Sequence, residues 1–173
     1  MIQLTFEPAY DPFHAIFRLL RLRPTIAAFG PLHREHVRIL DFYLLFPSRT
    51  SGIRLIPQHR RYRKLASDYQ AAKPYGDQPE DQIVFNRMEP MQVAALETLA
   101  ARNLLAPERL DVGKVEATAE PLPEEVAARV DAANHRDAEL MAFLGVLASE
   151  YTLTGANGLK DRTNLLEYRY DAV

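Results

Sequence analysis

The sequence predicts an α+β protein that is mostly α-helical. Two observations predict the helices: apolar residues recur at spacings of three and four through much of the chain, and prolines stand where these periodic stretches begin or end. A third observation predicts a small sheet, because Val112, Val115 and Thr118 surround an Asp-Val-Gly-Lys turn within residues 110–120. The expected architecture is a winged-helix-like element in residues 80–120, flanked by N-terminal helices and a long C-terminal helix.

The first half of the chain predicts three helices. The apolar stripe of the first one, residues 12–22, consists of Phe13, Ile16, Phe17 and Leu20. We expect Asp11 to cap this helix and Pro24 to lie in a connector beyond its end. Further helices are expected over residues 32–46 and 58–72.

The second half predicts the elements of the winged helix and then a long helix. Residues 82–85 are expected to form a strand, residues 90–102 a helix, and residues 110–120 a hairpin. Beyond Pro123, apolar residues step by four and three as far as residue 147, with the acidic Asp137 inside the stripe. This pattern predicts one long core or interface helix.

A boundary is expected in the stretch of residues 73–81, which is rich in proline and glycine. It would divide the chain into a basic N-terminal helical part, residues 1–73, and a second part, residues 74–173, that holds the winged-helix-like element, the long helix and the C-terminal segment. A single domain is the alternative, since 173 residues suit one core.

The composition restricts the chemistry and the location of the protein. The absence of cysteine excludes disulfides, thiolate nucleophiles and cysteine-ligated metals, and it fits a reducing cytoplasm. No apolar run reaches the roughly 18 residues that indicate a membrane span. Glu7 and Asp11 make the N-terminus unlike a signal peptide. We therefore expect a cytoplasmic protein that has no membrane contact.

Charge is divided unevenly along the chain. Residues 1–73 contain 12 Lys and Arg against 5 Asp and Glu, a net +7, whereas residues 74–173 contain 9 against 18, a net −9. One interpretation is that the basic part faces nucleic acid or an acidic partner, and the other is that the two parts pair with each other.

The clearest basic cluster lies in the third expected helix. It comprises Arg60, Arg61, Arg63 and Lys64, with Tyr62 inside it and with His59 and Arg54 nearby. These cations are candidates for contacts to the DNA backbone, and Tyr62 for stacking on a base. The alternatives are a solvated helix face or a docking surface for an acidic partner. The helix over residues 90–102, where a winged helix reads bases, is mostly Ala, Leu, Val and Glu, which argues against sequence-specific reading.

No motif predicts catalysis or a cofactor. The seven glycines do not form a phosphate-binding loop, and no serine has the flanking glycines of a nucleophile elbow. His33 and His36 share a helix face, but a zinc site needs three or four ligands, so we expect solvated histidines and no metal. The protein is not expected to be an enzyme.

The C-terminal segment, residues 158–171, alternates charged residues with large apolar and aromatic ones, which is unusual for a chain end. One interpretation is a strand or short helix packed on its own domain. The other is a docking segment for a partner protein, because aromatic and arginine anchors dominate such interfaces. The candidate interface residues are Leu159, Lys160, Arg162, Leu165, Leu166, Tyr168, Arg169 and Tyr170.

Three stretches, residues 11–23, 39–47 and 158–171, resemble one family. They contain Asp11-Pro12-Phe13-His14, then Asp41-Phe42-Tyr43-Leu44-Leu45-Phe46-Pro47, and finally Gly-Leu-Lys-Asp-Arg-Thr followed by Glu-Tyr-Arg-Tyr-Asp. The chain resembles the middle components of ABC-three-component systems, which are encoded with an SMC-like ABC ATPase and an effector in bacterial antiphage loci of the Lamassu kind. The arrangement also looks like the tandem winged-helix accessory subunits of SMC complexes.

The resemblance implies a non-enzymatic adaptor. Its partners would be the SMC-like ATPase and an effector such as a nuclease, and its role would be to couple the state of the ATPase to the effector in defence against phage or plasmid DNA. Duplex DNA contact would be weak or indirect. Two other classes stay open: a winged-helix DNA-binding transcriptional regulator and a small enzyme of unrecognised type.

Overall fold

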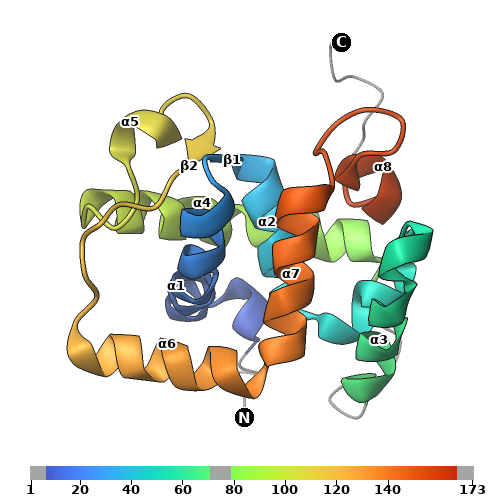
Figure 1. Ribbon diagram of the computed structural model, residues 1–173. Helices are drawn as coiled ribbons and strands as arrows, with labels where there is room; N and C mark the ends of the chain where they lie inside the picture. The colour runs from blue at the N-terminus through green and yellow to red at the C-terminus, as the bar shows by residue number, and fades with distance from the viewer. Residues whose placement is uncertain (1–6, 71–78, 167–173) are drawn as a thin grey trace, which may run out of the picture.

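The computed structural model describes residues 7–70 and 79–166, and helices dominate it (Figure 1). The α-helices are α1 (Pro12–Phe29), α2 (Arg34–Leu45), α3 (Lys64–Asp68), α4 (Asp81–Ala101), α5 (Pro107–Leu110), α6 (Glu124–Arg136), α7 (Ala138–Glu150) and α8 (Leu159–Thr163). Three 3₁₀ helices, η1 (Pro8–Tyr10), η2 (Pro47–Gly52) and η3 (Pro57–Arg63), and two strands, β1 (Leu32–His33) and β2 (Lys114–Val115), complete the fold. The mostly helical α+β class is therefore confirmed.

Helix α1 begins as expected but does not end where expected. The Asp11 carboxylate accepts a hydrogen bond from the backbone N–H of His14 at 2.8 Å, so the predicted cap is confirmed. The expected connector at Pro24 is wrong, because α1 continues through this proline to Phe29. A proline inside a helix costs about 3 kcal/mol or more. Here the buried side chains on both sides of it, such as Leu22 and Ile26, compensate by packing in the core.

Helix α4 corrects two further expectations. Residues 82–85, expected as a strand, form its first turn, and Pro90 lies within the helix instead of at its start. The physical reason is visible in the burial, since the apolar stripe begins at Val84 and continues at helical spacing. The buried side chains of this stripe are Val84, Phe85, Met88, Ala95, Leu96, Leu99 and Ala100.

The sheet joins distant parts of the chain. The expected hairpin over residues 110–120 is wrong, because β2 pairs antiparallel with β1 through Leu32 with Val115 and His33 with Lys114. An isolated antiparallel bridge joins Leu105 to Ala117 on the other side of the same segment. The predicted turn is present, and Gly113 occupies its left-handed position with φ of 74°.

The long C-terminal helix is divided in two at Asp137. This residue has φ of −102° and ψ of 33°, outside the helical region, and the chain changes direction there between α6 and α7 (Figure 1). The Asp137 carboxylate accepts hydrogen bonds from Arg21 at 2.8 Å, Tyr69 at 3.0 Å and Arg136 at 3.1 Å. Side-chain partners from distant parts of the chain therefore hold this corner. The apolar residues that step by four and three did not predict it.

Helix α1 lies at the centre of the molecule and packs against α2, α4, α6 and α7. The largest fully buried side chains include Tyr43 and Phe42 of α2, Phe85 of α4 and Phe143 of α7. The core thus contains residues from both ranges, 1–73 and 74–173. Within the described residues, no helix is long and apolar enough to cross a membrane.

Candidate interaction surface

The C-terminal helix α8 is docked on the segment that joins η2 to η3. The backbone N–H of Arg54 donates to the carbonyl of Arg162 at 3.1 Å, and the Arg162 guanidinium donates back to the carbonyl of Arg54. The Arg54 guanidinium also forms an ion pair with Asp161 at 2.8 Å. These reciprocal contacts bring together residues that are more than 100 positions apart in the sequence.

The predicted interface residues of this segment fall into three groups. Leu159, Lys160 and Leu165 are buried within the chain itself. Arg162 and Leu166 are half-buried. The remaining three, Tyr168, Arg169 and Tyr170, lie outside the described residues. Packing of residues 159–165 on their own domain was one of the two interpretations of this segment, and it holds for the buried members. Docking of a partner stays a prediction, because the half-buried members still expose part of their surface.

Lys160 ties α8 to the beginning of α2. Its ammonium group lies 2.7 Å from the Glu35 carboxylate, and only 7% of its side chain is exposed. The neighbouring His33 caps α2 by accepting the backbone N–H of Glu35 at 3.3 Å. Burial lowers the pKa of His33, and the nearby cations Lys114 and Lys160 lower it further, against the opposing effect of Glu35. This histidine therefore serves as a neutral cap.

The entry to α8 requires glycine. A Cβ atom on Gly158 would overlap the backbone carbonyl oxygens of Thr154 and Leu153, although its own φ is an ordinary −75°. The close approach therefore fixes where the chain turns into α8.

The basic cluster lies on η3 and the start of α3. Arg60, Arg61 and Arg63 are exposed, as the sequence predicts, and Lys64 forms an ion pair with Glu139 at 3.1 Å. Neither Arg60 nor Arg63 has an acidic partner among the described residues. The third expected helix, residues 58–72, is a 3₁₀ helix up to Arg63 and becomes α-helical only from Lys64.

Tyr62 and His59 do not belong to the exposed cluster. Tyr62 is buried against Phe143, with ring centroids 4.8 Å apart, so the expected stacking of Tyr62 on a base is wrong for this structure. His59 is also buried, and its two ring nitrogens lie 2.8 Å from the Tyr151 hydroxyl and 3.0 Å from the Glu150 carboxylate. Both rings anchor η3 to the end of α7.

Tyr151 joins the basic cluster to the C-terminal helix. Its hydroxyl contacts His59, and the Arg162 guanidinium lies over its ring at 5.5 Å from the centroid. Segments 53–64 and 158–166 therefore lie against each other, with Tyr151 between them.

The uneven charge of the sequence is largely resolved inside the molecule. Five ion pairs among the described residues join a Lys or Arg of residues 1–73 to an acidic side chain of residues 74–173. They are Arg21–Asp137, Arg38–Glu89, Arg49–Asp81, Arg54–Asp161 and Lys64–Glu139. Pairing of the two parts with each other was one interpretation of the asymmetry, and these contacts support it.

The sequence analysis missed a buried polar network between α1, α2 and α4. The Asp41 carboxylate is fully buried and accepts hydrogen bonds from Arg18 at 2.7 and 3.1 Å and from the Gln92 amide at 2.8 Å. Gln92 in turn accepts from Arg38 at 2.9 Å. The signal was present in the sequence, because Asp41 stands inside an otherwise apolar run from Ile39 to Phe46.

Arg38 is the least satisfied member of this network. Its guanidinium lies over the ring of Phe85 and forms an ion pair with Glu89 at 3.2 Å, but its Nη2 has no hydrogen-bond partner. Burial lowers the pKa of Arg38, against the opposing effect of Glu89. Its side chain is committed to packing α2 on α4.

His33 and His36 do not converge on a metal site. The Nε2–H of His36 donates to the carbonyl of Leu147 at 2.8 Å, and the side chain is buried, so the expectation that it is solvated is wrong. Within residues 7–70 and 79–166, no group of three or more His, Asp or Glu side chains is arranged to hold a metal ion.

Comparison with known proteins gives one match. A family model described as ABC-three-component (ABC-3C) system Middle Component 5 matches residues 4–171, nearly the whole chain. No curated protein and no solved structure matches it. Because the family model covers far more than half of the sequence, the chain belongs to the family of ABC-three-component system middle components.

Proposed function

We propose that this protein is a non-enzymatic accessory subunit that links an SMC-like ABC ATPase to an effector, such as a nuclease, in antiphage or antiplasmid defence of the Lamassu kind. The observation that carries the proposal is the family match over residues 4–171. The cytoplasmic location expected from the sequence is part of the proposal. The chain contributes binding surfaces, while the chemistry belongs to its partners.

The strand arrangement supports a winged-helix-like core for this subunit. Segment 114–117 lies between Leu32 of β1 on one side and Leu105 on the other. In the chain β1 follows α1 and precedes α2, whereas Leu105 and β2 follow α4. In this interpretation α4 takes the place of the base-reading helix. Its exposed side chains are Ile83, Asn86, Arg87, Glu89, Pro90, Ala94, Glu97, Thr98 and Ala101. A face with one arginine and two glutamates suits a protein partner better than DNA.

Co-expression with the neighbouring genes tests the proposal. The tagged chain is purified at moderate salt together with the ATPase and the effector encoded beside it, and the mass of the complex is measured. We expect a stable assembly that contains the ATPase. Recovery of this chain without the ATPase, when all three proteins are made in soluble form, would contradict the accessory role.

A second candidate function is that of a DNA-binding regulator, and the exposed Arg60, Arg61 and Arg63 favour it. If these cations contact phosphates, affinity for duplex DNA falls with salt by a slope of about −0.9 per phosphate contact. The triple change of these residues to alanine is expected to reduce the slope by two or three units. The matched control changes three exposed arginines outside both the cluster and α4, namely Arg109, Arg129 and Arg136. If the two triple variants reduce the salt slope equally, the cluster makes no specific contact and only non-specific attraction between DNA and exposed cations is left.

A further inference from the structure

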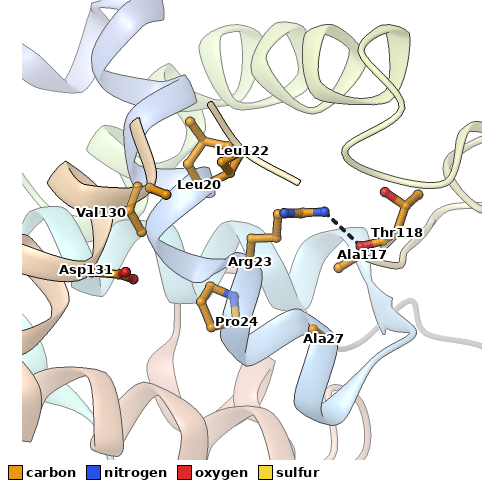
Figure 2. A pocket seen from close by; sticks show the side chains of 10 residues that line it. Leu20, Arg23, Pro24, Ala27, Ala117, Thr118, Leu122, Val130 and Asp131 are labelled. Atoms are coloured by element: carbon orange, nitrogen blue, oxygen red, sulfur yellow. Dashed lines mark hydrogen bonds between the residues drawn. The ribbon is translucent and has the colours of Figure 1, made fainter. Parts of the chain in front are cut away.

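A groove lies along one side of α1. It has a volume of about 290 Å³ and lies between α1, segment 117–122 and α6 (Figure 2). Its lining residues are Leu20, Arg23, Pro24, Ala27, Ala117, Thr118, Leu122, Ala127, Val130 and Asp131. Since an apolar cavity of roughly 150 Å³ accommodates benzene, this groove has room for at least one large side chain.

The walls of the groove are mostly apolar and come from three elements. Leu20 and Ala27 belong to α1, Leu122 to the connecting segment, and Val130 to α6. Leu122 is only half-buried, which leaves apolar surface accessible at the mouth. Apolar surface of this kind gains about 25 cal/mol per Å² when a ligand covers it.

Arg23 fixes the shape of the groove through hydrogen bonds to backbone carbonyls. Its Nε donates to the carbonyl of Leu104 at 3.1 Å and one Nη donates to the carbonyl of Thr118 at 2.7 Å, the second contact being drawn in Figure 2. The same Nη donates to the carbonyl of Glu120. The guanidinium is thereby occupied in holding segment 117–122 against α1, and it does not act as a free cation in the groove.

Two residues that line the groove carry an acceptor without a full set of donors. Pro24 has no N–H, so the carbonyl of Leu20, four residues earlier, lacks its normal helical donor. Asp131 is exposed at the rim and makes no hydrogen bond or ion pair with another described residue. The surrounding segment, residues 116–131, contains five acids and a single base, Arg129. The groove therefore combines apolar walls with one carboxylate, that of Asp131, at its rim.

We propose that this groove binds a peptide segment of a partner protein in which a large apolar side chain stands next to Lys or Arg. The apolar side chain fills the space between Leu20, Leu122 and Val130, and the cation pairs with Asp131. This inference rests on the proposed accessory role, because it names a surface by which the subunit holds another component. An acidic or purely polar segment would not fit the charge of the rim.

A displayed library of random 12-residue peptides tests the groove directly on the full chain. We expect the enriched peptides to share an aliphatic or aromatic residue adjacent to Lys or Arg. The change Ala27→Trp fills the groove from an exposed position and is expected to abolish binding. Ala28→Trp places the same side chain on the neighbouring exposed position outside the groove and is expected to leave binding unchanged.

A matched pair of variants tests the charge at the rim of the groove. Asp131→Asn removes the carboxylate charge and is expected to weaken the selected peptides about tenfold, the effect of losing one charge-assisted contact. Glu125→Gln, an exposed acid on α6 that does not line the groove, is expected to have no such effect. Enriched peptides that lack the apolar and basic pair, or that bind the Ala27→Trp protein equally well, would overturn the proposal.

In the co-expression experiment, the same variants distinguish failure of the groove proposal from failure of the accessory role. If the Ala27→Trp protein loses the co-purified subunit and Ala28→Trp retains it, the groove is the docking site. If both variants retain the ATPase and the effector, the accessory role stands and the groove proposal is wrong. If even the unchanged chain recovers no partner, the accessory role fails, while the peptide selection still decides what the groove binds.

Discussion

Asp41 is the residue whose environment most constrains the fold. It is fully buried, and its two oxygens are held by Arg18 and Gln92, which come from the helices on either side. A buried carboxylate is tolerated only when its partners compensate for the lost hydration. The network therefore aligns α1, α2 and α4 through hydrogen bonds that tolerate little displacement.

Replacing Asp41 by alanine is expected to destabilise the protein severely. The change leaves the Arg18 guanidinium buried without its counter-charge, which typically costs about 3–5 kcal/mol. Asp41→Asn keeps the size and one acceptor and should lose less. Urea unfolding measures both, and Asp68→Ala, at an exposed position on α3, is the control. A loss no larger than that of the control would contradict the structural role of the network.

His36 makes stability depend on pH. Burial lowers its pKa, although the hydrogen bond to Leu147 opposes this effect. Because the folded pKa lies below the unfolded value of about 6.5, the stabilisation is complete above that pH and is lost as the pH falls towards the folded value. His36→Gln removes the titration and keeps a side-chain donor. The free energy of unfolding of the original protein should thus fall more than that of the variant between about pH 7 and pH 5, and equal declines would refute the assignment.

At the scale of elements, chain turns are held by contacts between distant segments. Asp137 ends α6 and begins α7 because Arg21 and Tyr69 approach it from elsewhere in the chain. Burial works to raise the pKa of Asp137, but hydrogen bonds from Arg136, Tyr69 and Arg21 outweigh it and keep the pKa below its ordinary value. At the start of α8 the chain turn depends instead on Gly158, because there is no room for a Cβ atom at this position.

Gly158→Ala is expected to displace α8. The added methyl group would collide with two backbone carbonyls, and such overpacking typically costs about 1–3 kcal/mol. Gly52→Ala is the matched control, because the nearest atom to its added Cβ is the Asp81 carboxylate at 3.9 Å. Thermal unfolding gives the cost, and hydrogen exchange of residues 159–165 locates it. Unchanged exchange in this segment would show that α8 adjusts without leaving its place.

Prediction from sequence succeeded where local signals determine the structure, and it failed where residues distant in the chain determine it. The cap at Asp11 and the body of α2 follow from capping chemistry and helical periodicity. The partner of β2 lies some 80 residues earlier in the chain, and no local pattern specifies it. The candidate site shows the same division, because exposure of Arg60, Arg61 and Arg63 was predictable, whereas burial of Leu159 and Lys160 depends on where α8 docks.

At the scale of the whole molecule, the two oppositely charged parts neutralise each other through pairs of very different exposure. Arg21 and Asp137 have side chains that are 9% and 13% exposed, whereas Lys64 and Glu139 are 63% and 48% exposed. Exposed pairs contribute little and are screened by salt, while buried pairs are screened much less. The pairing therefore orients the parts mainly through its buried members.

A charge-swap experiment tests this difference. Lys64→Glu should destabilise the protein by up to about 1 kcal/mol, and the addition of Glu139→Lys should restore most of the loss. At about 1 M salt the coupling between the two positions should disappear, because the screening length falls to about 3 Å. The coupling comes from a double-mutant cycle of urea unfolding curves. Persistence of the full coupling at high salt would mean that the pair is stabilised by packing.

The five ion pairs between the two parts also bear on how the chain is synthesised. A ribosome releases the basic part first, and its net charge of +7 has no internal counter-charge until the acids between Asp81 and Asp161 emerge. During that interval the nascent chain is a polycation surrounded by RNA. The second part thus acts as a built-in counter-ion for the first, and the last of these pairs, Arg54–Asp161, forms only after residue 161 has been added.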